Sequence, residues 1–233
     1  MYTYIKENLD EVKDRIARAA IKSGRQPEEI TLIAVTKTLS LDVINAAMAL
    51  GITDIGENKV QEVMDKYDHV VNEPKWHLIG HLQTNKVKYI VDKVSLIHSV
   101  DSFRLAEEIS KRCEKAEKIM DILIQINVAE EATKFGISRD EIFELVEEVS
   151  QLPNIRIKGL MTIAPNTEDT EALRNYFSEM KDIFETLKKT MYNKTDMTFL
   201  SMGMTNDYEI AIEEGANMVR VGTGIFGARD YSK

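Results

Sequence analysis

A lysine directly follows the apolar run 32–36 and places an amine where a buried strand would end. Barrel enzymes keep their chemistry at the carboxyl ends of such strands. Partial desolvation favours an uncharged amine, whose lone pair can attack an aldehyde. Lys37 is therefore a candidate for imine formation. The alternative is a lysine that merely ends the strand and reaches into water.

A second candidate site follows the last apolar run, 218–221, where the chain continues as Gly222-Thr223-Gly224. Glycines let backbone amides approach an anion closely, and a short helix beginning here would turn its positive end toward that anion. Barrels often hold a phosphate after their seventh and eighth strands, so we predict a phosphate cup at this segment. The alternative is a simple turn, because glycine and threonine are common turn residues.

The seventh apolar run leads into Ser201-Met202-Gly203-Met204-Thr205. Ser201 and Thr205 offer hydroxyls toward the same cup. Met202 and Met204 offer soft apolar surface for a flat ring, and core packing is the alternative for both. This segment is therefore predicted to complete the phosphate cup.

Arg220 lies two residues before the cup, within reach of a ring held by a phosphate at one end and by Lys37 at the other. A ring that carries both an aldehyde and a phosphate is pyridoxal phosphate (PLP), which is the predicted cofactor. An arginine that faces the pyridine nitrogen disfavours protonation there, so the ring would be a weak electron sink.

Further polar residues follow other expected strands, namely Asn58, His77 and Asn127, and these are expected to converge on the same mouth of the barrel. His77 and His81 have no matching pair of ligand residues nearby, which favours hydrogen bonding over a metal site. We interpret Glu57 as a solvated carboxylate at the end of a strand.

Short apolar runs alternate with helical patterns along the chain, which is typical of parallel strands joined by crossover helices. An amphipathic helix at 4–23 comes first and is expected to cover the base of the barrel. The pattern predicts one (β/α)8 TIM-barrel domain over 1–233, with 1–25 as an extra N-terminal helical segment. An open doubly wound sheet is the alternative, because the alternation does not show that the first and last strands pair. The eight runs are 31–37, 54–57, 76–80, 96–99, 122–127, 155–161, 198–201 and 218–221.

The bulk composition restricts the possible partners of the chain. With 233 residues and 43% hydrophobic content, it can bury a large core. A net charge of -9 argues against nonspecific binding to nucleic acid or to an anionic membrane. One cysteine, Cys113, and no signal-peptide pattern predict a reducing, cytoplasmic location.

Taken together, these residues resemble the pyridoxal-phosphate homeostasis protein family, which is related in fold to the N-terminal barrel domain of alanine racemase. The resemblance spans nearly the whole sequence. It implies that Lys37 holds PLP as an internal aldimine and that Arg220 lies toward the ring nitrogen. It also implies cofactor contacts from Asn58, Ser201, Met202, Gly222 and Thr223. The motifs that carry it are Ala34-Val35-Thr36-Lys37, Gly56-Glu57-Asn58, Trp76-His77-Leu78-Ile79-Gly80, Gly159-Leu160-Met161, Leu200-Ser201-Met202-Gly203-Met204 and Arg220-Val221-Gly222-Thr223.

The resemblance implies a PLP carrier that keeps the free cofactor low and supplies it to PLP-dependent apoenzymes. Racemase relatives draw an opposing base from a second domain across a dimer. This chain stops at Lys233, so we expect a monomer without efficient turnover. One alternative is a racemase or decarboxylase of narrow scope with Tyr208 or a histidine as second base. Another is a cofactor-free Schiff-base aldolase. Lys134 and Lys233 are interpreted as solvated surface charge rather than as a second PLP site.

Overall fold

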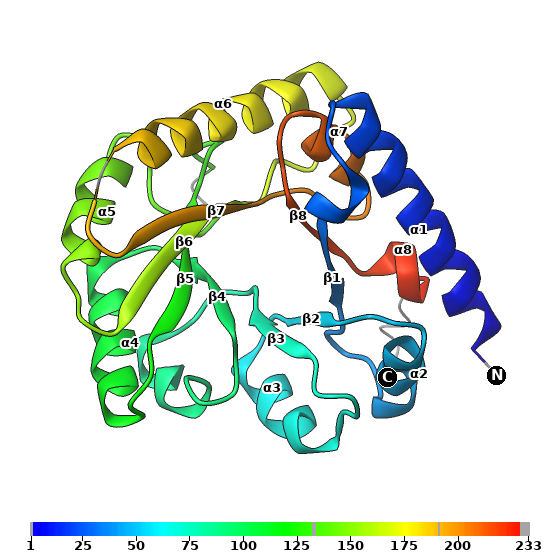
Figure 1. The fold of residues 1–233 in the computed structure, drawn as a ribbon, viewed down its shortest axis with the longest axis horizontal. Coiled ribbons are helices and arrows are strands. Elements are labelled where there is room, and N and C mark those ends of the chain that lie inside the picture. The colour runs from blue at the N-terminus through cyan, green and yellow to red at the C-terminus, as the bar shows by residue number, and fades with distance from the viewer. Residues whose placement is uncertain (1, 132–133, 191, 229–233) are drawn as a thin grey trace.

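The computed structural model of the chain describes residues 2–131, 134–190 and 192–228. Eight parallel strands form a closed barrel and follow the chain order around it (Figure 1). The strands are β1 (Thr31–Val35), β2 (Asp54–Glu57), β3 (Lys75–Leu78), β4 (Leu96–Val100), β5 (Met120–Ile126), β6 (Ile155–Thr162), β7 (Thr195–Ser201) and β8 (Met218–Val221).

Closure depends on the pairing between the first and last strands. Strand β1 pairs in parallel with β8, and Ile33 lies opposite Arg220 in this register. The open sheet is therefore excluded, and the predicted (β/α)8 barrel is confirmed.

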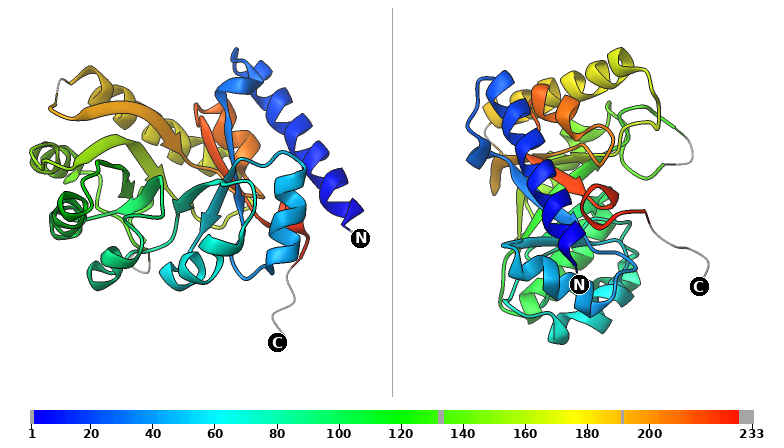
Figure 2. Two further views of the ribbon diagram at one scale, coloured as in Figure 1. Left: turned by 60° about the horizontal axis from the view of Figure 1, so that its bottom comes forward. Right: turned by 90° about the vertical axis from the view of Figure 1, so that its right-hand side faces the viewer.

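Helices surround the barrel on its outside, as the two views of Figure 2 show. The connection between β3 and β4 is a 3₁₀ helix, η3, which buries only one apolar residue, Val87. None of the helices in the described ranges is long and apolar enough to span a bilayer. The helical elements are α1 (Thr3–Lys22), η1 (Pro27–Glu29), α2 (Leu41–Ala49), α3 (Val60–Lys66), η2 (Tyr67–His69), η3 (Thr84–Tyr89), α4 (Phe103–Lys115), α5 (Ile142–Ser150), α6 (Thr170–Lys189), α7 (Tyr208–Glu213) and α8 (Thr223–Phe226).

The barrel has two apolar layers because strand side chains alternate between its two faces. The larger layer fills the space between strands and helices. At Gly159, the strands come so close that an added Cβ would lie 1.8 Å from the carbonyl oxygen of Phe199, so only glycine fits. The smaller layer lies inside the barrel and consists of Ile33, Leu96, Leu123, Met161 and Met218.

Helix α1 packs along the side of the barrel against α7 and α8, and not across the base as the sequence analysis expects (Figure 1). The reason is that α8 has only four residues and cannot cover the wall at β8 and β1. The buried face of α1 fills this space. The Asn8 side chain also donates a hydrogen bond to the Ile225 carbonyl at 3.0 Å, so α1 supports the turn that follows β8.

Candidate functional site

A cavity of about 590 Å³ opens at the carboxyl ends of the barrel strands. Its volume lies within the range of small-molecule binding sites. Four of the seven cofactor contacts that the family resemblance implies line it, namely Lys37, Arg220, Gly222 and Thr223. The rest of its wall comes mainly from loops after β5, β6 and β7, with residues Val35, Glu131, Lys134, Ile163, Ala164, Pro165, Asn166, Met204, Thr205, Asn206 and Asp207.

Lys37 lies two residues beyond the end of β1 and is half-buried in this cavity. Its amine forms no hydrogen bond or ion pair with the residues that the structure describes. An amine without such a partner keeps its nitrogen accessible to a bound aldehyde. The structure therefore permits the imine chemistry that the sequence predicts for this residue.

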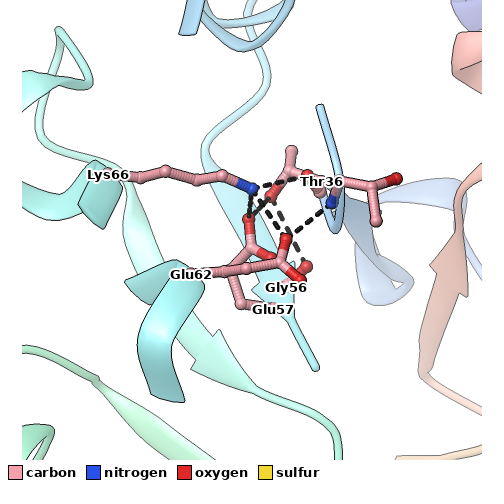
Figure 3. Close-up of polar contacts among 6 residues, drawn as sticks. Thr36, Gly56, Glu57, Glu62 and Lys66 are labelled. Atoms are coloured by element: carbon pink, nitrogen blue, oxygen red, sulfur yellow. Dashed lines mark hydrogen bonds and ion pairs between the residues drawn. The ribbon is translucent and has the colours of Figure 1, made fainter. Parts of the chain in front are cut away.

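The backbone on both sides of Lys37 is fixed by a pair of charged side chains from α3 (Figure 3). Lys66 Nζ donates to the Thr36 carbonyl at 3.0 Å, and the Thr38 amide donates to Glu62 Oε2 at 2.6 Å. Lys66 and Glu62 also pair with each other at 3.0 Å. Thr38 has a φ of +64°, which is uncommon for a β-branched residue. The charged pair therefore stabilises the turn that presents Lys37 to the cavity.

Glu57 completes this cluster, and its interpretation as a solvated carboxylate is wrong. Its side chain is fully buried at the end of β2. Oε1 accepts hydrogen bonds from Thr36 Oγ1 at 2.7 Å and from Lys66 Nζ at 2.8 Å (Figure 3). Oε2 has no hydrogen-bond partner among the described residues. Burial raises the pKa of Glu57 to about 7, although the charge of Lys66 opposes the shift.

The raised pKa of Glu57 predicts a pH dependence of folding stability. The folded chain binds this proton more tightly than the unfolded chain, so the free energy of unfolding should fall as pH rises from 4.5 to about 7. Glu57→Gln should remove this fall because glutamine does not titrate. Denaturant unfolding across this window measures the effect. The matched control is Glu114→Gln at an exposed position of α4, which should keep the wild-type slope; an unchanged slope in Glu57→Gln would contradict the prediction.

In the part of the cavity wall that follows β8, Gly222 is the N-cap of the short helix α8. The Gly224 amide donates to Thr205 Oγ1 at 3.3 Å, and the hydroxyls of Thr223 and Thr205 lie 3.2 Å apart. Both threonines and Gly222 line the cavity. The turn therefore brings hydroxyls and backbone together in the way that phosphate binding requires.

Ser201 and Met202 belong to the predicted site but do not line the cavity. Ser201 is fully buried, and its Oγ accepts a hydrogen bond from Arg220 Nη1 at 2.6 Å. Met202 is fully buried in the layer between strands and helices. Of the two possibilities for this residue, core packing is the one that the structure shows. Side chains alternate along a strand, so Ser201 points into the barrel interior and Met202 points toward the helices. Met204, 37% exposed, is the methionine that lines the cavity.

Arg220 lies in the wall of the cavity with only 3% of its surface exposed. In addition to Ser201, its guanidinium donates from Nη2 to the Thr162 carbonyl at 2.8 Å. Burial lowers the pKa of Arg220 to about 10, and the nearby carboxylate of Asp207 opposes this shift. The guanidinium therefore keeps its charge at neutral pH.

Asn58 lies in a second, neighbouring cavity of about 270 Å³, which it shares with His81. Its backbone comes so close to Gly80 that an added Cβ there would lie 2.3 Å from the Asn58 carbonyl oxygen. Any side chain at position 80 would displace Asn58. Asn58 therefore does not line the larger cavity.

Asn127 also stays outside the cavity wall and instead shapes the loop that follows β5. Its Nδ2 donates to the Glu131 carbonyl at 2.9 Å, and its Oδ1 accepts from the Glu131 amide at 3.2 Å. This loop turns Glu131 and Lys134 into the cavity. Lys134 donates to Glu131 Oε1 at 2.7 Å and to the Ala164 carbonyl at 3.1 Å. It is therefore a wall residue and not the solvated charge that the sequence suggests; Lys233 lies outside the described residues.

Two further predictions concern His77 and Tyr208. His77 is hydrogen-bonded through both ring nitrogens, to Asp54 and His98, which confirms its hydrogen-bonding role. Among the described residues, no three metal-binding side chains gather around a common point. Tyr208 is buried in α7, and its hydroxyl has no partner in the described part of the chain. It does not line the cavity, so it is not placed to act as a second base there.

A comparison with protein families matches residues 7–230 to the alanine racemase N-terminal domain. The chain is 43% identical over 226 residues to the pyridoxal phosphate homeostasis protein of Aquifex aeolicus, with 97% of this chain and 98% of that protein covered. The chain belongs to the pyridoxal phosphate homeostasis protein family.

Solved structures agree with this family assignment. A protein of Bifidobacterium adolescentis superposes with a TM-score of 0.92 at 34% identity and covers 96% of this chain and 95% of its own. PipY of Synechococcus elongatus, solved with PLP bound, superposes with a TM-score of 0.83 at 31% identity and covers 96% of this chain and 100% of its own. The barrel of this chain is thus the barrel of the pyridoxal phosphate homeostasis proteins.

Proposed function

We propose that this chain binds PLP in the larger cavity and contributes to PLP homeostasis by holding and delivering the cofactor. The observation that carries this proposal is that one cavity contains both the Lys37 amine, which has no hydrogen-bond or ion-pair partner among the described residues, and a turn with hydroxyls and backbone donors at 222–224. An amine and an anion site in a cavity of about 590 Å³ suit a small phosphorylated aldehyde.

Each end of the cavity has a proposed role. The Lys37 amine attacks the aldehyde carbon, the aldehyde oxygen leaves as water, and a C=N bond remains. Gly222 and Thr223, with Thr205, bind the phosphate. Arg220 faces the ring nitrogen and disfavours its protonation. When bound, PLP supplies an aldehyde and an electron-withdrawing ring.

The relatives support the cofactor in this proposal. PipY was solved with PLP bound, and the Aquifex aeolicus relative is named for pyridoxal phosphate homeostasis. Delivery to PLP-dependent apoenzymes, action as a monomer and a cytoplasmic location are further parts of the proposal. The carrier role is favoured over turnover because Tyr208 lies outside the cavity.

Loading of the purified protein with PLP tests the proposal. The protein is mixed with PLP, the imine is reduced with borohydride, and the mass of the protein is measured by mass spectrometry. One covalent PLP per chain is the expected result. Absence of both visible colour and added mass would refute an imine between PLP and the protein, and absence of any binding in an equilibrium titration as well would leave the cofactor-free aldolase. Transfer to a PLP-dependent apoenzyme, followed by its regained activity, tests delivery separately.

The phosphate end of the cavity gives a second prediction. Thr205→Val keeps the side-chain volume but removes the hydroxyl that accepts from the Gly224 amide. Loss of one hydroxyl from an anion site should weaken PLP binding roughly tenfold. Equilibrium titration measures the affinity. Thr198→Val, at an exposed site of β7, is the control. Pyridoxal, which lacks the phosphate, should lose little affinity for Thr205→Val, and an equal loss for both compounds would place the phosphate elsewhere.

A further inference from the structure

A continuous chain of buried hydrogen bonds crosses the barrel interior from β2 to the wall of the cavity. Its members are five buried residues whose exposed fraction is at most 7%, namely Asp54, His77, His98, Ser201 and Arg220. The links are Asp54 Oδ1 to His77 Nε2 at 2.9 Å, His77 Nδ1 to His98 Nε2 at 3.0 Å, His98 Nδ1 to Ser201 Oγ at 3.1 Å and Ser201 Oγ to Arg220 Nη1 at 2.6 Å.

At the Asp54 end of this chain, the side chain can only accept hydrogen bonds. Burial alone would raise the pKa of the Asp54 carboxyl, but hydrogen bonds from His77 and Thr53 outweigh it and lower the pKa below its usual value. Asp54 is therefore a carboxylate, and a carboxylate is acceptor-only. The proton in its bond to His77 must consequently belong to His77 Nε2.

The Arg220 end can only donate, because a guanidinium has no acceptor. Ser201 Oγ accepts the Arg220 hydrogen bond, so its own hydroxyl proton is free to go to His98 Nδ1. Full burial, reinforced by the positive charge of Arg220, holds the pKa of His98 well below its ordinary value, so His98 is neutral. With its Nδ1 accepting from Ser201, His98 carries its proton on Nε2 and donates it to His77 Nδ1.

The two ends therefore fix one direction for every link in between. Each group donates toward Asp54, and each histidine is neutral with its proton on Nε2. In the opposite direction His98 Nδ1 would donate to Ser201 Oγ, and the buried Ser201 hydroxyl proton would then have no side-chain acceptor among the described residues. Such a chain has one low-energy proton arrangement and holds its terminal groups in place.

We infer that Asp54, His77 and His98 are positioning residues that act through Ser201 to hold the Arg220 guanidinium in the wall of the PLP cavity. The link to PLP rests on the proposed function. The buried Asp54 carboxylate on β2 does not line the cavity. Through the hydrogen-bond chain it nevertheless positions the Arg220 guanidinium, which does line the cavity.

The proton arrangement can be measured directly, without any cofactor. The protein has four histidines, so ¹⁵N NMR of histidine-labelled protein gives few signals, and nitrogen shifts distinguish protonated from unprotonated ring positions. At neutral pH, His77 and His98 should both be neutral and carry the proton on Nε2. A proton on Nδ1 of either ring, or a cationic His77, would overturn the inference.

Two substitutions at Asp54 separate positioning from mere packing. Asp54→Asn keeps an acceptor oxygen for His77, whereas Asp54→Leu removes it at similar volume. Asp54→Asn should keep both histidine tautomers and PLP affinity, while Asp54→Leu should lose the tautomers and bind PLP roughly tenfold more weakly. Asp196→Leu, at an exposed carboxylate of β7, should change neither.

The outcomes distinguish the role of the hydrogen-bond chain from the binding of PLP. Wild-type protein that shows the expected tautomers but takes up no PLP would refute the cofactor and leave the hydrogen-bond chain intact. Equal PLP affinity for Asp54→Leu and wild type, both folded by circular dichroism, would refute the positioning role. If Asp54→Leu does not fold, the tautomers of wild type and Asp54→Asn still decide the inference.

Discussion

Lys37→Ala is expected to abolish covalent loading with PLP, from one molecule per chain to background. The reason is that an imine requires a primary amine, and alanine supplies none. The backbone around position 37 is held by Lys66 and Glu62 and should keep its shape. The cavity should therefore still bind PLP noncovalently, more weakly and without the colour of the imine. Borohydride reduction and mass spectrometry measure the covalent fraction.

A second lysine in the same cavity provides the matched control. Lys134 also lines the wall, but its amine is engaged by Glu131 and by the Ala164 carbonyl. Lys134→Ala should therefore leave covalent loading intact. Undiminished covalent loading of Lys37→Ala, with the added mass mapped to Lys134 by peptide analysis, would show that the tether has been assigned to the wrong amine.

Lys66→Met should destabilise the protein strongly. Lys66 is the cation beside the fully buried Glu57, and the same amine binds Glu62 and the Thr36 carbonyl. Removing one partner of a buried ion pair leaves an uncompensated charge, which costs about 3–5 kcal/mol. For a chain of this length the melting temperature should fall by roughly 10 °C. Denaturant unfolding and thermal melts measure both quantities.

The effect of Lys66→Met should also depend on pH. In the wild-type protein the Lys66 charge lowers the pKa of Glu57, so the substitution should raise this pKa further. When Glu57 binds a proton, the cost of a buried unpaired carboxylate disappears. The loss of stability should therefore be smaller in mildly acid than in mildly alkaline buffer. The control is Lys111→Met, at a surface pair with Glu107 in α4, which should change stability little. A similarly small change for Lys66→Met would show that the cluster does not stabilise the turn at Lys37.

Local patterns in the sequence were sufficient to predict the barrel and part of its cavity. Alternating apolar runs and helical patterns give parallel strands, and the carboxyl ends of such strands share one rim. Lys37, Arg220, Gly222 and Thr223 each follow from a position at or just after a strand end, and they line one cavity. The sequence does not show that β1 and β8 pair, because pairing between residues far apart in the chain leaves no local signal. The structure shows this pairing.

The cluster around Glu57 illustrates what the sequence could not reveal. Glu57 ends a strand, where a carboxylate is usually solvated, and only the packing of α3 brings Lys66 over it. The sequence likewise predicts surface charge at Lys134, because nothing in the local sequence shows that this residue lines the cavity. In both cases a distant element determines the burial of a charged side chain.

The sequence by itself determined the chemical groups and the strand ends at which they stand. Only the tertiary structure decided which groups share a cavity, which are buried and which direction a hydrogen bond takes. The physical reason is that side-chain identity and alternation are local properties of the chain. Burial and pairing depend on contacts such as His98 with Ser201, which are 103 residues apart.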